Sequence, residues 1–380
     1  MSKWPGKYVI GLTGNIGTGK SVVRRMLEHL GAYGIDADTL GHRAIARGAP
    51  GYQPVVSAFG RYVVGPDGEI NRARLGRVVF GDPEAMAMLE QVVHPLVEQA
   101  VDLMVQRASQ PVIVIEAIKL FEAGLARLCD GVWVTYAPPE VQLARLVQQR
   151  KMKDVDARQR IVAQPPQEKK VSQASVVIKN VGSFEDTWKQ VAVAWQKNVP
   201  AAAAATLSAQ PERAAPQGEL VVVRGKPRHS NEIADLLNRL RKQAVPLKKD
   251  DIMAAFGEKA FLLLQVGATN AGVIGWQVEN LVSRTMDIVI DPAVPVNQAL
   301  PLLITEMEKA SRELQCEASL VFAPPELARQ ESIWKSLGYE NRAAETLGVQ
   351  AWMEAAHEST LPNTVMYFKQ LRIDRILRPI

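Results

Sequence analysis

Residues 8–21 read Tyr-Val-Ile-Gly-Leu-Thr-Gly-Asn-Ile-Gly-Thr-Gly-Lys-Ser and decide the fold of the N-terminal half. The run Tyr8–Thr13 is short and nearly all apolar, which is typical of a strand covered on both faces. Gly14–Ser21 fits the pattern G-x-x-x-x-G-K-[ST], and the helical pattern of Ser21–Leu30 follows directly. A strand, this loop and a helix in that order form the context in which the pattern binds phosphates. The stretch therefore predicts a site for a nucleoside triphosphate.

The spacing of glycines in this loop has a physical reason. Gly14, Gly17 and Gly19 permit backbone angles and a close approach that a Cβ atom would block. The N–H groups of the loop and of the helix N-terminus then converge on the phosphates. Lys20 is placed to neutralise the β- and γ-phosphates, and the Ser21 hydroxyl can coordinate Mg²⁺. We expect the nucleotide to be bound by Gly14, Asn15, Ile16, Gly17, Thr18, Gly19, Lys20, Ser21 and Val22.

The rest of the first half alternates strand-like and helical stretches. Val112–Glu116 and Gly131–Thr135 are further short apolar runs, and Pro83–Ala108 and Pro139–Arg150 have helical patterns. This alternation predicts an α/β fold with a parallel sheet flanked by helices. No Asn-Lys-x-Asp motif for reading guanine occurs in the chain, so small-molecule kinases fit better than GTPases.

The second half has a different character. Residues 200–219 are rich in Ala, Pro and Gln without an amphipathic period, which is typical of a linker. After it, three consecutive strand patterns and three helical patterns, His229–Lys242, Gln298–Leu314 and Glu326–Leu337, predict an α+β domain with an antiparallel meander. The predicted division is therefore residues 1–199, a linker at 200–219, and residues 220–380.

Composition limits the class of protein. The 380 residues are 47% hydrophobic and 22% charged, which is ordinary for a globular protein and argues against global disorder. No run of 18 apolar residues predicts a membrane span, and the N-terminus lacks the pattern of a secretory signal. Cys129 and Cys316 are too few and too far apart for a disulfide framework. We therefore expect a cytoplasmic protein without a membrane partner.

The net charge of +5 is unevenly distributed. Residues 1–200 hold 25 Lys+Arg and 19 Asp+Glu, whereas residues 201–380 hold 20 and 21. Segment 141–170 alone contains eight basic and three acidic residues, but no aromatic residue. It lacks the stacking platform of a single-strand binder, so we expect no nucleic-acid partner. A solvated helical face is the simpler interpretation of its charge.

Two carboxylates follow the expected strand Ala32–Ile35. A carboxylate at the C-terminal end of the second strand of such a sheet faces the crevice where ligands bind. Asp36 can accept the proton of an attacking hydroxyl. Asp38 can orient Mg²⁺-bound water or pin the loop. An alternative for Asp38 is a helix N-cap, because it precedes the helical stretch Thr39–Ala46.

Six separate segments carry a resemblance to a known family. They are Gly11–Ser21, Ile35–Asp38, His94–Leu96, Leu120–Glu122, the lid residues Arg145, Arg160, Ile161 and Gln164, and Ala174–Gly182. In order and spacing they resemble the dephospho-CoA kinase family over about residues 7–195. The resemblance implies a P-loop kinase with a core, a helical CoA-side insertion at residues 51–103 and a lid. It also implies transfer of a phosphoryl group from ATP, with Mg²⁺, to the ribose 3′-hydroxyl of dephospho-CoA, the last step of CoA synthesis.

The resemblance also implies residue roles. Asp36 matches the general base, and Lys20 belongs to the phosphate loop. Arg145 matches a lid arginine that stabilises the transferring group. Asn180 and Gly182 fall in the loop expected beside adenine. With the loop argument above, the expected catalytic residues are Asp36, Lys20 and Arg145, and the expected Mg²⁺ ligands are Ser21 and Asp38.

The lid departs from the family pattern at two positions. Gln149 stands where an arginine is expected, with Arg150 one place on. Gln167 stands where a second basic residue is expected, with Lys169 and Lys170 close by. Lid cations stabilise the transferring phosphoryl group. An alternative to the kinase is therefore a nucleotide-binding regulator whose weakened lid no longer supports catalysis.

The second half resembles the GNAT-type N-acetyltransferases in the order of its elements over residues 220–371. Glu331–Tyr339 looks like that family's late helix and Leu-Gly-aromatic turn. The family's pyrophosphate loop needs glycine, but Pro292–Leu300 has none and contains two prolines that lack an N–H donor. We expect a non-catalytic interaction module. The alternative is a bifunctional protein with acetyl-CoA-dependent transferase activity.

Overall fold

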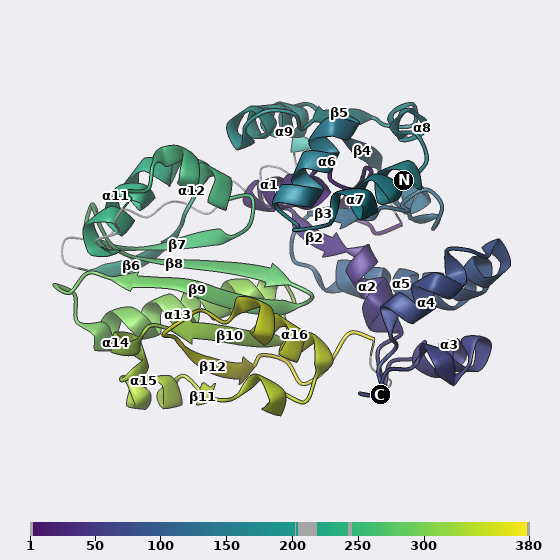
Figure 1. Ribbon diagram of the computed structural model, residues 1–380. Coiled ribbons are helices and arrows are strands. Elements are labelled where there is room, and N and C mark those ends of the chain that lie inside the picture. Colours follow the sequence, from purple (N-terminus) through teal and green to yellow (C-terminus); the bar gives the residue numbers. More distant parts are fainter. Residues whose placement is uncertain (1–2, 202, 204–218, 242–244, 378–380) are drawn as a thin grey trace.

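The first half is built on a five-stranded sheet in which every pairing is parallel. The computed structural model describes residues 3–201, 203, 219–241 and 245–377. The strand order β2-β3-β1-β4-β5 places β1, which ends at the glycine loop, in the centre of the sheet. Figure 1 labels β2, β3, β4 and β5 among the helices of this half. The strands are β1 (Tyr8–Thr13), β2 (Tyr33–Asp36), β3 (Val112–Glu116), β4 (Gly131–Tyr136) and β5 (Val176–Lys179). The predicted parallel sheet is confirmed.

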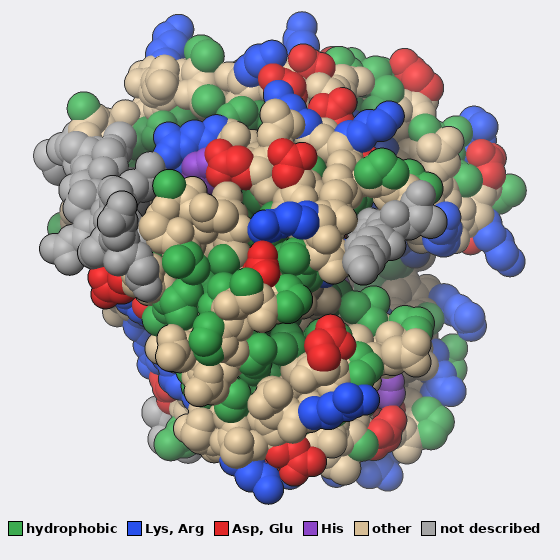
Figure 2. Space-filling model, turned by 90° about the vertical axis from the view of Figure 1, so that its left-hand side faces the viewer, with side chains coloured by type: hydrophobic (Ala, Val, Ile, Leu, Met, Phe, Trp, Pro, Cys, Tyr) green, Lys and Arg blue, Asp and Glu red, His purple; other side chains and the backbone are tan. Residues whose placement is uncertain are grey.

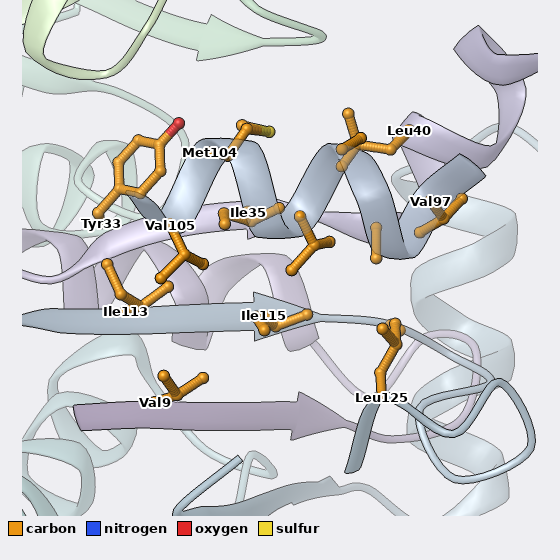
Figure 3. Packing of buried hydrophobic residues seen from close by; sticks show 14 of the residues in the cluster. Val9, Tyr33, Ile35, Leu40, Val97, Met104, Val105, Ile113, Ile115 and Leu125 are labelled. Atoms are coloured by element: carbon orange, nitrogen blue, oxygen red, sulfur yellow. The ribbon is translucent and has the colours of Figure 1, made fainter. Parts of the chain in front are cut away.

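Helices cover both faces of this sheet, which explains why its strands are apolar throughout. On one face lie α1 (Lys20–His29) and α9 (Phe184–Asn198), and on the other lie α2 (Ala37–Ala44) and α5 (Pro83–Arg107). Val9, Ile113 and Ile115 of the strands pack against Met104 and Val105 of α5 (Figure 3). These helices therefore cover the two faces of the sheet and leave the carboxyl ends of its strands to the loops that follow them.

Two helical groups extend from the edge at which the strands end. The first, between α2 and α5, contains α3 (Tyr52–Phe59), a 3₁₀ turn (Arg61–Val63) and α4 (Arg72–Val79), which share a small core of their own. The second follows β4 and contains α6 (Pro139–Gln148), α7 (Asp154–Val162) and α8 (Gln167–Val171). The second group agrees with the predicted lid, whereas the helical insertion predicted over residues 51–103 ends earlier, because α5 from Val97 onward packs against the sheet. A 3₁₀ turn (Leu125–Leu128) joins β3 to β4.

The second half contains a seven-stranded mixed sheet with the order β11-β12-β10-β9-β8-β7-β6. β6 to β9 form the predicted antiparallel meander, whereas β10 pairs with β9 in parallel. The strands are β6 (Leu220–Arg224), β7 (Ala260–Val266), β8 (Thr269–Glu279), β9 (Val282–Ile290), β10 (Ala318–Ala323), β11 (Glu340–Asn341) and β12 (Val365–Gln370). The predicted α+β class is confirmed.

Helices cover both faces of the second sheet as well. The longest, α13 (Val296–Glu313), packs on one face together with α14 (Pro325–Ala328) and α15 (Glu331–Ser336). The other face is covered by α11 (Ser230–Arg241), α12 (Lys249–Ala255) and α16 (Gln350–Ser359). Two further 3₁₀ turns are Pro227–His229 and Ala344–Thr346.

The structure corrects two details of the sequence analysis. The helix expected over Glu326–Leu337 is two short helices, because the chain turns at Arg329 and Gln330 between them. Helices α12 and α16 were not predicted from the sequence. Most of the predicted linker, residues 202 and 204–218, lies outside the described residues.

The two halves share a hydrophobic core. Leu281 and Ile376 of the second half lie in the same buried cluster as Tyr33 and Ile35 of β2.

On the face shown in Figure 2, basic and acidic side chains are interspersed among hydrophobic ones over the described part of the surface. Among the described residues, no helix is long and apolar enough to cross a membrane.

Candidate active site

The glycine loop is shaped by sterics. Gly17 and Gly19 have φ of +75° and +89°, in the left-handed region that favours glycine. A Cβ atom on Gly19 would lie 2.0 Å from the Asn180 amide nitrogen, and one on Gly14 would lie 2.3 Å from the Thr135 hydroxyl. The loop can therefore approach β4 and the Asn180 loop only because these side chains are missing.

Polar contacts hold the loop in this shape before any ligand binds. The Thr18 hydroxyl lies 2.7 Å from the Asn15 carbonyl oxygen, to which it donates, and 2.8 Å from the Thr135 hydroxyl. The Asn180 amide donates to the Thr18 carbonyl oxygen over 3.0 Å. A preformed loop does not have to be ordered when phosphates bind, so less affinity is lost to ordering.

Lys20 begins α1 and is buried, with 8% of its surface exposed. Its ammonium has no hydrogen bond or ion pair with any residue of the described chain. Burial lowers the pKa of Lys20, although the carboxylates of Glu116 and Asp38 oppose that shift and Arg150 adds to it. Burying an amine without a hydrogen bond or an ion pair is energetically unfavourable. It is explained if anionic oxygens complete the site.

Glu116 is a candidate site residue that was not singled out from the sequence. It ends β3 beside β1, is 3% exposed, and accepts a hydrogen bond of 2.9 Å from the Ser21 hydroxyl. Arg24 of the same helix donates to its other oxygen over 2.7 Å. The signal was available, because Val112–Glu116 is four apolar residues followed by one carboxylate at the open edge of the sheet.

Asp36 and Asp38 have different local roles. The Oδ1 atom of Asp36 accepts from the Thr39 N–H over 2.9 Å, so Asp36 is the N-cap of α2. The suggestion that Asp38 caps this helix is wrong, because α2 starts two residues earlier than the sequence pattern indicated. Asp38 instead accepts from the Ile118 N–H, at 3.0 and 3.2 Å from its two oxygens, and pins the loop after β3. Burial and the charge of Asp36 raise the pKa of Asp38 to about 6.

Arg145 contacts the middle of the glycine loop. Its guanidinium donates to the Gly17 carbonyl oxygen over 3.2 Å and to the Asn180 carbonyl oxygen over 2.9 Å. It therefore ties the glycine loop to the loop expected beside adenine. Gly182 lies in that second loop, just before α9, and Val22 is half-buried in the first turn of α1.

The lid reaches the glycine loop and the loop after β3. The Gln164 side-chain oxygen accepts from the Ile16 N–H over 2.7 Å, and the Asn15 amide donates to the Pro165 carbonyl oxygen over 2.9 Å. Lys170 is 5% exposed and donates to the Ile118 carbonyl oxygen over 2.8 Å. Burial lowers the pKa of Lys170, Glu122 opposes that shift, and the charge of Lys20 adds to it. Lys170 thus supplies a positive charge near the phosphate site.

Comparison with known proteins agrees with this geometry. The family model for dephospho-CoA kinase matches residues 8–186. The chain is 43% identical over 194 residues to the dephospho-CoA kinase of Geobacter metallireducens, covering 50% of this chain and 96% of that protein. This chain belongs to the dephospho-CoA kinase family. A second relative, the dephospho-CoA kinase of Streptomyces avermitilis, is 43% identical over 187 residues, covering 49% of this chain and 91% of that protein.

Solved structures resemble each half separately. The structure of TT1252 from Thermus thermophilus is 33% identical in sequence, with a TM-score of 0.47. The match covers 51% of this chain and 98% of the TT1252 chain. The ribosomal-protein-S18-alanine N-acetyltransferase of Escherichia coli is 11% identical, with a TM-score of 0.32, and covers 41% of this chain and 97% of its own.

Within this kinase-family chain, the predicted site residues fall into two groups. Lys20, Ser21, Asp36 and Asp38 meet at the open edge of the sheet, joined by Glu116. Arg145 and Asn180 form the other group, which contacts the glycine loop at Gly17 and Thr18, and Gly182 follows in the Asn180 loop. The individual roles assigned to these residues stay predictions.

The turn between β9 and α13 is where the resemblance to acetyltransferases would place a pyrophosphate loop. Here it is closed by its own backbone: Val294 donates to the Asp291 carbonyl oxygen over 2.9 Å, and Pro295 stands at the helix N-cap. Pro292 and Pro295 provide no N–H groups. The structure therefore adds no feature that favours acetyl transfer over the expected interaction module.

Proposed function

We propose that this chain transfers the γ-phosphoryl group of ATP to the 3′-hydroxyl of dephospho-CoA, the last step of CoA synthesis. Membership of the dephospho-CoA kinase family supports this activity. The observation that carries it is the buried, unpartnered Lys20 of the described chain, set between a preformed phosphate loop and the carboxylates Asp36, Asp38 and Glu116. Phosphates on one side of this lysine and a hydroxyl acceptor on the other would complete the site.

Asp36 would act on the acceptor. Its Oδ1 atom is committed to the N-cap of α2, so Oδ2 remains to accept the proton of the attacking ribose hydroxyl. The cap bond fixes the orientation of the carboxylate, which is what a general base needs. Lys20 and the N–H groups of the loop would hold the β- and γ-phosphates in line with that hydroxyl.

The residues present also fit a magnesium ion. Ser21 and Glu116 are a hydroxyl and a carboxylate in contact, and Asp38 lies on the same side of Lys20. Mg²⁺ is usually held by one or two carboxylates together with substrate phosphates and water. Within the described residues no cluster of three His, Cys, Asp or Glu could hold a metal alone. When bound, Mg²⁺ would neutralise charge on the β- and γ-phosphates.

The lid of this chain would supply cations from shifted positions. Arg150 lies near enough to Lys20 to lower the pKa of that lysine. It is therefore placed to supply the positive charge that Gln149 lacks. Lys170 is placed likewise, whereas Gln167 is buried and donates to the Ala137 carbonyl oxygen over 2.9 Å. These positions favour catalysis over the regulator, because charge near the phosphates is kept.

The test is release of ADP by the purified full chain, with ATP and Mg²⁺, in the presence and absence of dephospho-CoA. Release that depends on dephospho-CoA supports the kinase. Tight ATP binding without release supports the regulator. The cytoplasm and the absence of nucleic-acid or membrane partners stay predictions.

A further inference from the structure

The outer end of α2 is buried by the second half of the chain. Arg43 in its last turn is 8% exposed, and its guanidinium lies 2.6 Å from the carboxylate of Glu317, which is 1% exposed. The same guanidinium donates to the Asn280 carbonyl oxygen over 3.0 Å. Both partners belong to the second sheet domain, so this helix is held from outside the kinase fold.

Three consecutive residues of the loop between α13 and β10 reach three elements of the first half. The Gln315 amide donates to the Met104 carbonyl oxygen of α5 over 2.8 Å. Cys316 lies beside Tyr33 of β2, where burial and this thiol together raise the pKa of the tyrosine hydroxyl. Glu317 pairs with Arg43 of α2. We call residues 315–317 the brace.

Three residues at these contacts have positive φ. Gln315, Asn280 and Leu281 have φ of +59°, +52° and +57°, in the left-handed region that most residues with a Cβ atom avoid. Gln315 lies just after α13, where its N–H and that of the next residue donate to carbonyl oxygens of the last helical turn, as is usual for a left-handed helix end. Asn280 and Leu281 form a two-residue hairpin turn, which needs positive φ at both positions. The two turns present the Gln315 amide and the Leu281 side chain to the first half.

The three elements that the brace contacts surround one point. β2 ends at Asp36, α2 begins there, and α5 packs against both in one buried cluster. Arg43 follows Asp36 by seven residues, about two turns or 10 Å of helix. A helix of eight residues is marginal alone and takes its position from tertiary contacts. The brace is thus placed to set where Asp36 points.

We propose that Glu317 is a positioning residue of the kinase reaction. Acting through Arg43, it fixes α2 and so holds Asp36 against the acceptor hydroxyl. The second half then serves the kinase site as a brace, without chemistry of its own. This inference rests on the proposed function, since it needs Asp36 to act on the acceptor.

The ion pair is suited to this task because further contacts hold the Glu317 carboxylate in place. Glu317 also accepts from the Ile376 N–H over 3.1 Å, and the Arg375 guanidinium lies 3.6 Å from its Oε2 atom. Removing one partner of a buried pair leaves an uncompensated charge. The remaining partner would then move toward water and carry α2 with it.

The test compares Glu317→Gln with Glu331→Gln in the full chain. Glu331 belongs to an exposed pair with Lys335 in the same domain, 4.0 Å apart, and is a matched control. We expect Glu317→Gln to lower kcat about tenfold or more, because a shift of about 1 Å in a catalytic group has effects of that size. ATP should still bind at one site per chain, with KM for ATP within about twofold of the unsubstituted chain. Glu331→Gln should leave kcat unchanged.

Two results overturn the proposal. One is an unchanged kcat for Glu317→Gln. The other is a fall in kcat that matches a fall in ATP sites per chain, because that indicates lost folded protein alone. Where Glu317→Gln does not fold, Arg43→Lys replaces it: the charge stays, the two-pronged contact is lost, and kcat should fall with ATP sites intact. If the unsubstituted chain shows no release of ADP that depends on dephospho-CoA, the proposed function itself fails, which is a separate outcome.

Discussion

In the proposed reaction, Asp36 combines a structural and a chemical task in one side chain. One carboxylate oxygen caps α2, and the other is left for the acceptor. A capping residue that also acts as a base must keep both its shape and its charge. Asparagine keeps the shape and removes the charge, and it is as good an N-cap as aspartate. This makes a clean separation of the two tasks possible.

Asp36→Asn is expected to lower turnover about a hundredfold or more, the scale of losing a general base. The free energy of unfolding should change little, because the cap is retained. ATP affinity should also be unchanged, since the phosphate loop belongs to β1 and α1. Steady-state kinetics with titration calorimetry for ATP check this. Turnover equal to that of the unsubstituted chain would remove Asp36 from the mechanism.

Asp38 gives the protein a defined pH dependence of stability. Its pKa is raised to about 6 by burial and by Asp36, whereas the unfolded chain releases this proton near pH 4. Between these values the native state holds a proton that the unfolded state lacks, so the free energy of unfolding falls as pH rises. His29 has the opposite effect on the free energy of unfolding, because burial lowers its pKa to about 4. Above that pH the unfolded state binds a proton on His29 that the native state lacks, so this contribution to stability rises with pH.

The contribution of Asp38 is therefore measured as a difference between variants. From pH 4 to pH 7, the free energy of unfolding of Asp38→Asn should rise by about 2–3 kcal/mol relative to the unsubstituted chain. His29 is present in both proteins and cancels. Urea titrations at several pH values check this. A difference that does not vary with pH would mean that Asp38 titrates normally in the folded protein.

At the level of elements, the turn between β8 and β9 shows most plainly how the halves fit. It has two residues, Asn280 and Leu281, both with positive φ. Such hairpin turns usually carry Asn-Gly. Leucine in place of glycine strains the turn, but its side chain is buried in the core cluster of the first half. Leucine at this position therefore makes the turn itself less stable but adds a buried contact between the halves.

Leu281→Gly should accordingly destabilise the full chain. Relief of strain is worth about 1–2 kcal/mol, whereas emptying a buried leucine site costs about 2–5 kcal/mol. Asn280→Gly is the control: asparagine and glycine both suit this position of the turn, the carbonyl oxygen that Arg43 binds is kept, and a side-chain oxygen that is buried without a partner is lost. It should be neutral or stabilising in thermal unfolding. If Leu281→Gly were stabilising, the leucine would not be anchoring the halves.

Much of the element order could be predicted from sequence, and the reasons are local. The strands of the first sheet are short apolar runs, and the glycine loop marks the turn from the first strand to the first helix. The contacts of the brace could not be predicted. Arg43 and Glu317 are charged residues 274 positions apart, and such residues are usually exposed. Only their packing against each other reveals that both are buried.

At the scale of the whole molecule, the two halves are joined by a shared core and a buried ion pair. Leu281 and Ile376 complete the cluster around Tyr33, and Arg43 with Glu317 lies at its edge. Separating the halves would expose this cluster to water. The halves should therefore not unfold independently.

Scanning calorimetry of the full chain should show one cooperative transition, with a calorimetric enthalpy equal to the van't Hoff enthalpy. Glu317→Gln should broaden or split it, because the ion pair between the halves is broken. Two well-separated transitions in the unsubstituted chain would contradict a shared core.

The central claim is that this chain phosphorylates dephospho-CoA on its ribose, and the identity of the product tests it most directly. The full chain is incubated with ATP, Mg²⁺ and dephospho-CoA, and the product is examined by mass spectrometry and phosphorus NMR. The account predicts dephospho-CoA heavier by one phosphoryl group, with a new monoester at the 3′ position and one ADP formed per product. Formation of ADP and inorganic phosphate with dephospho-CoA unchanged would contradict it.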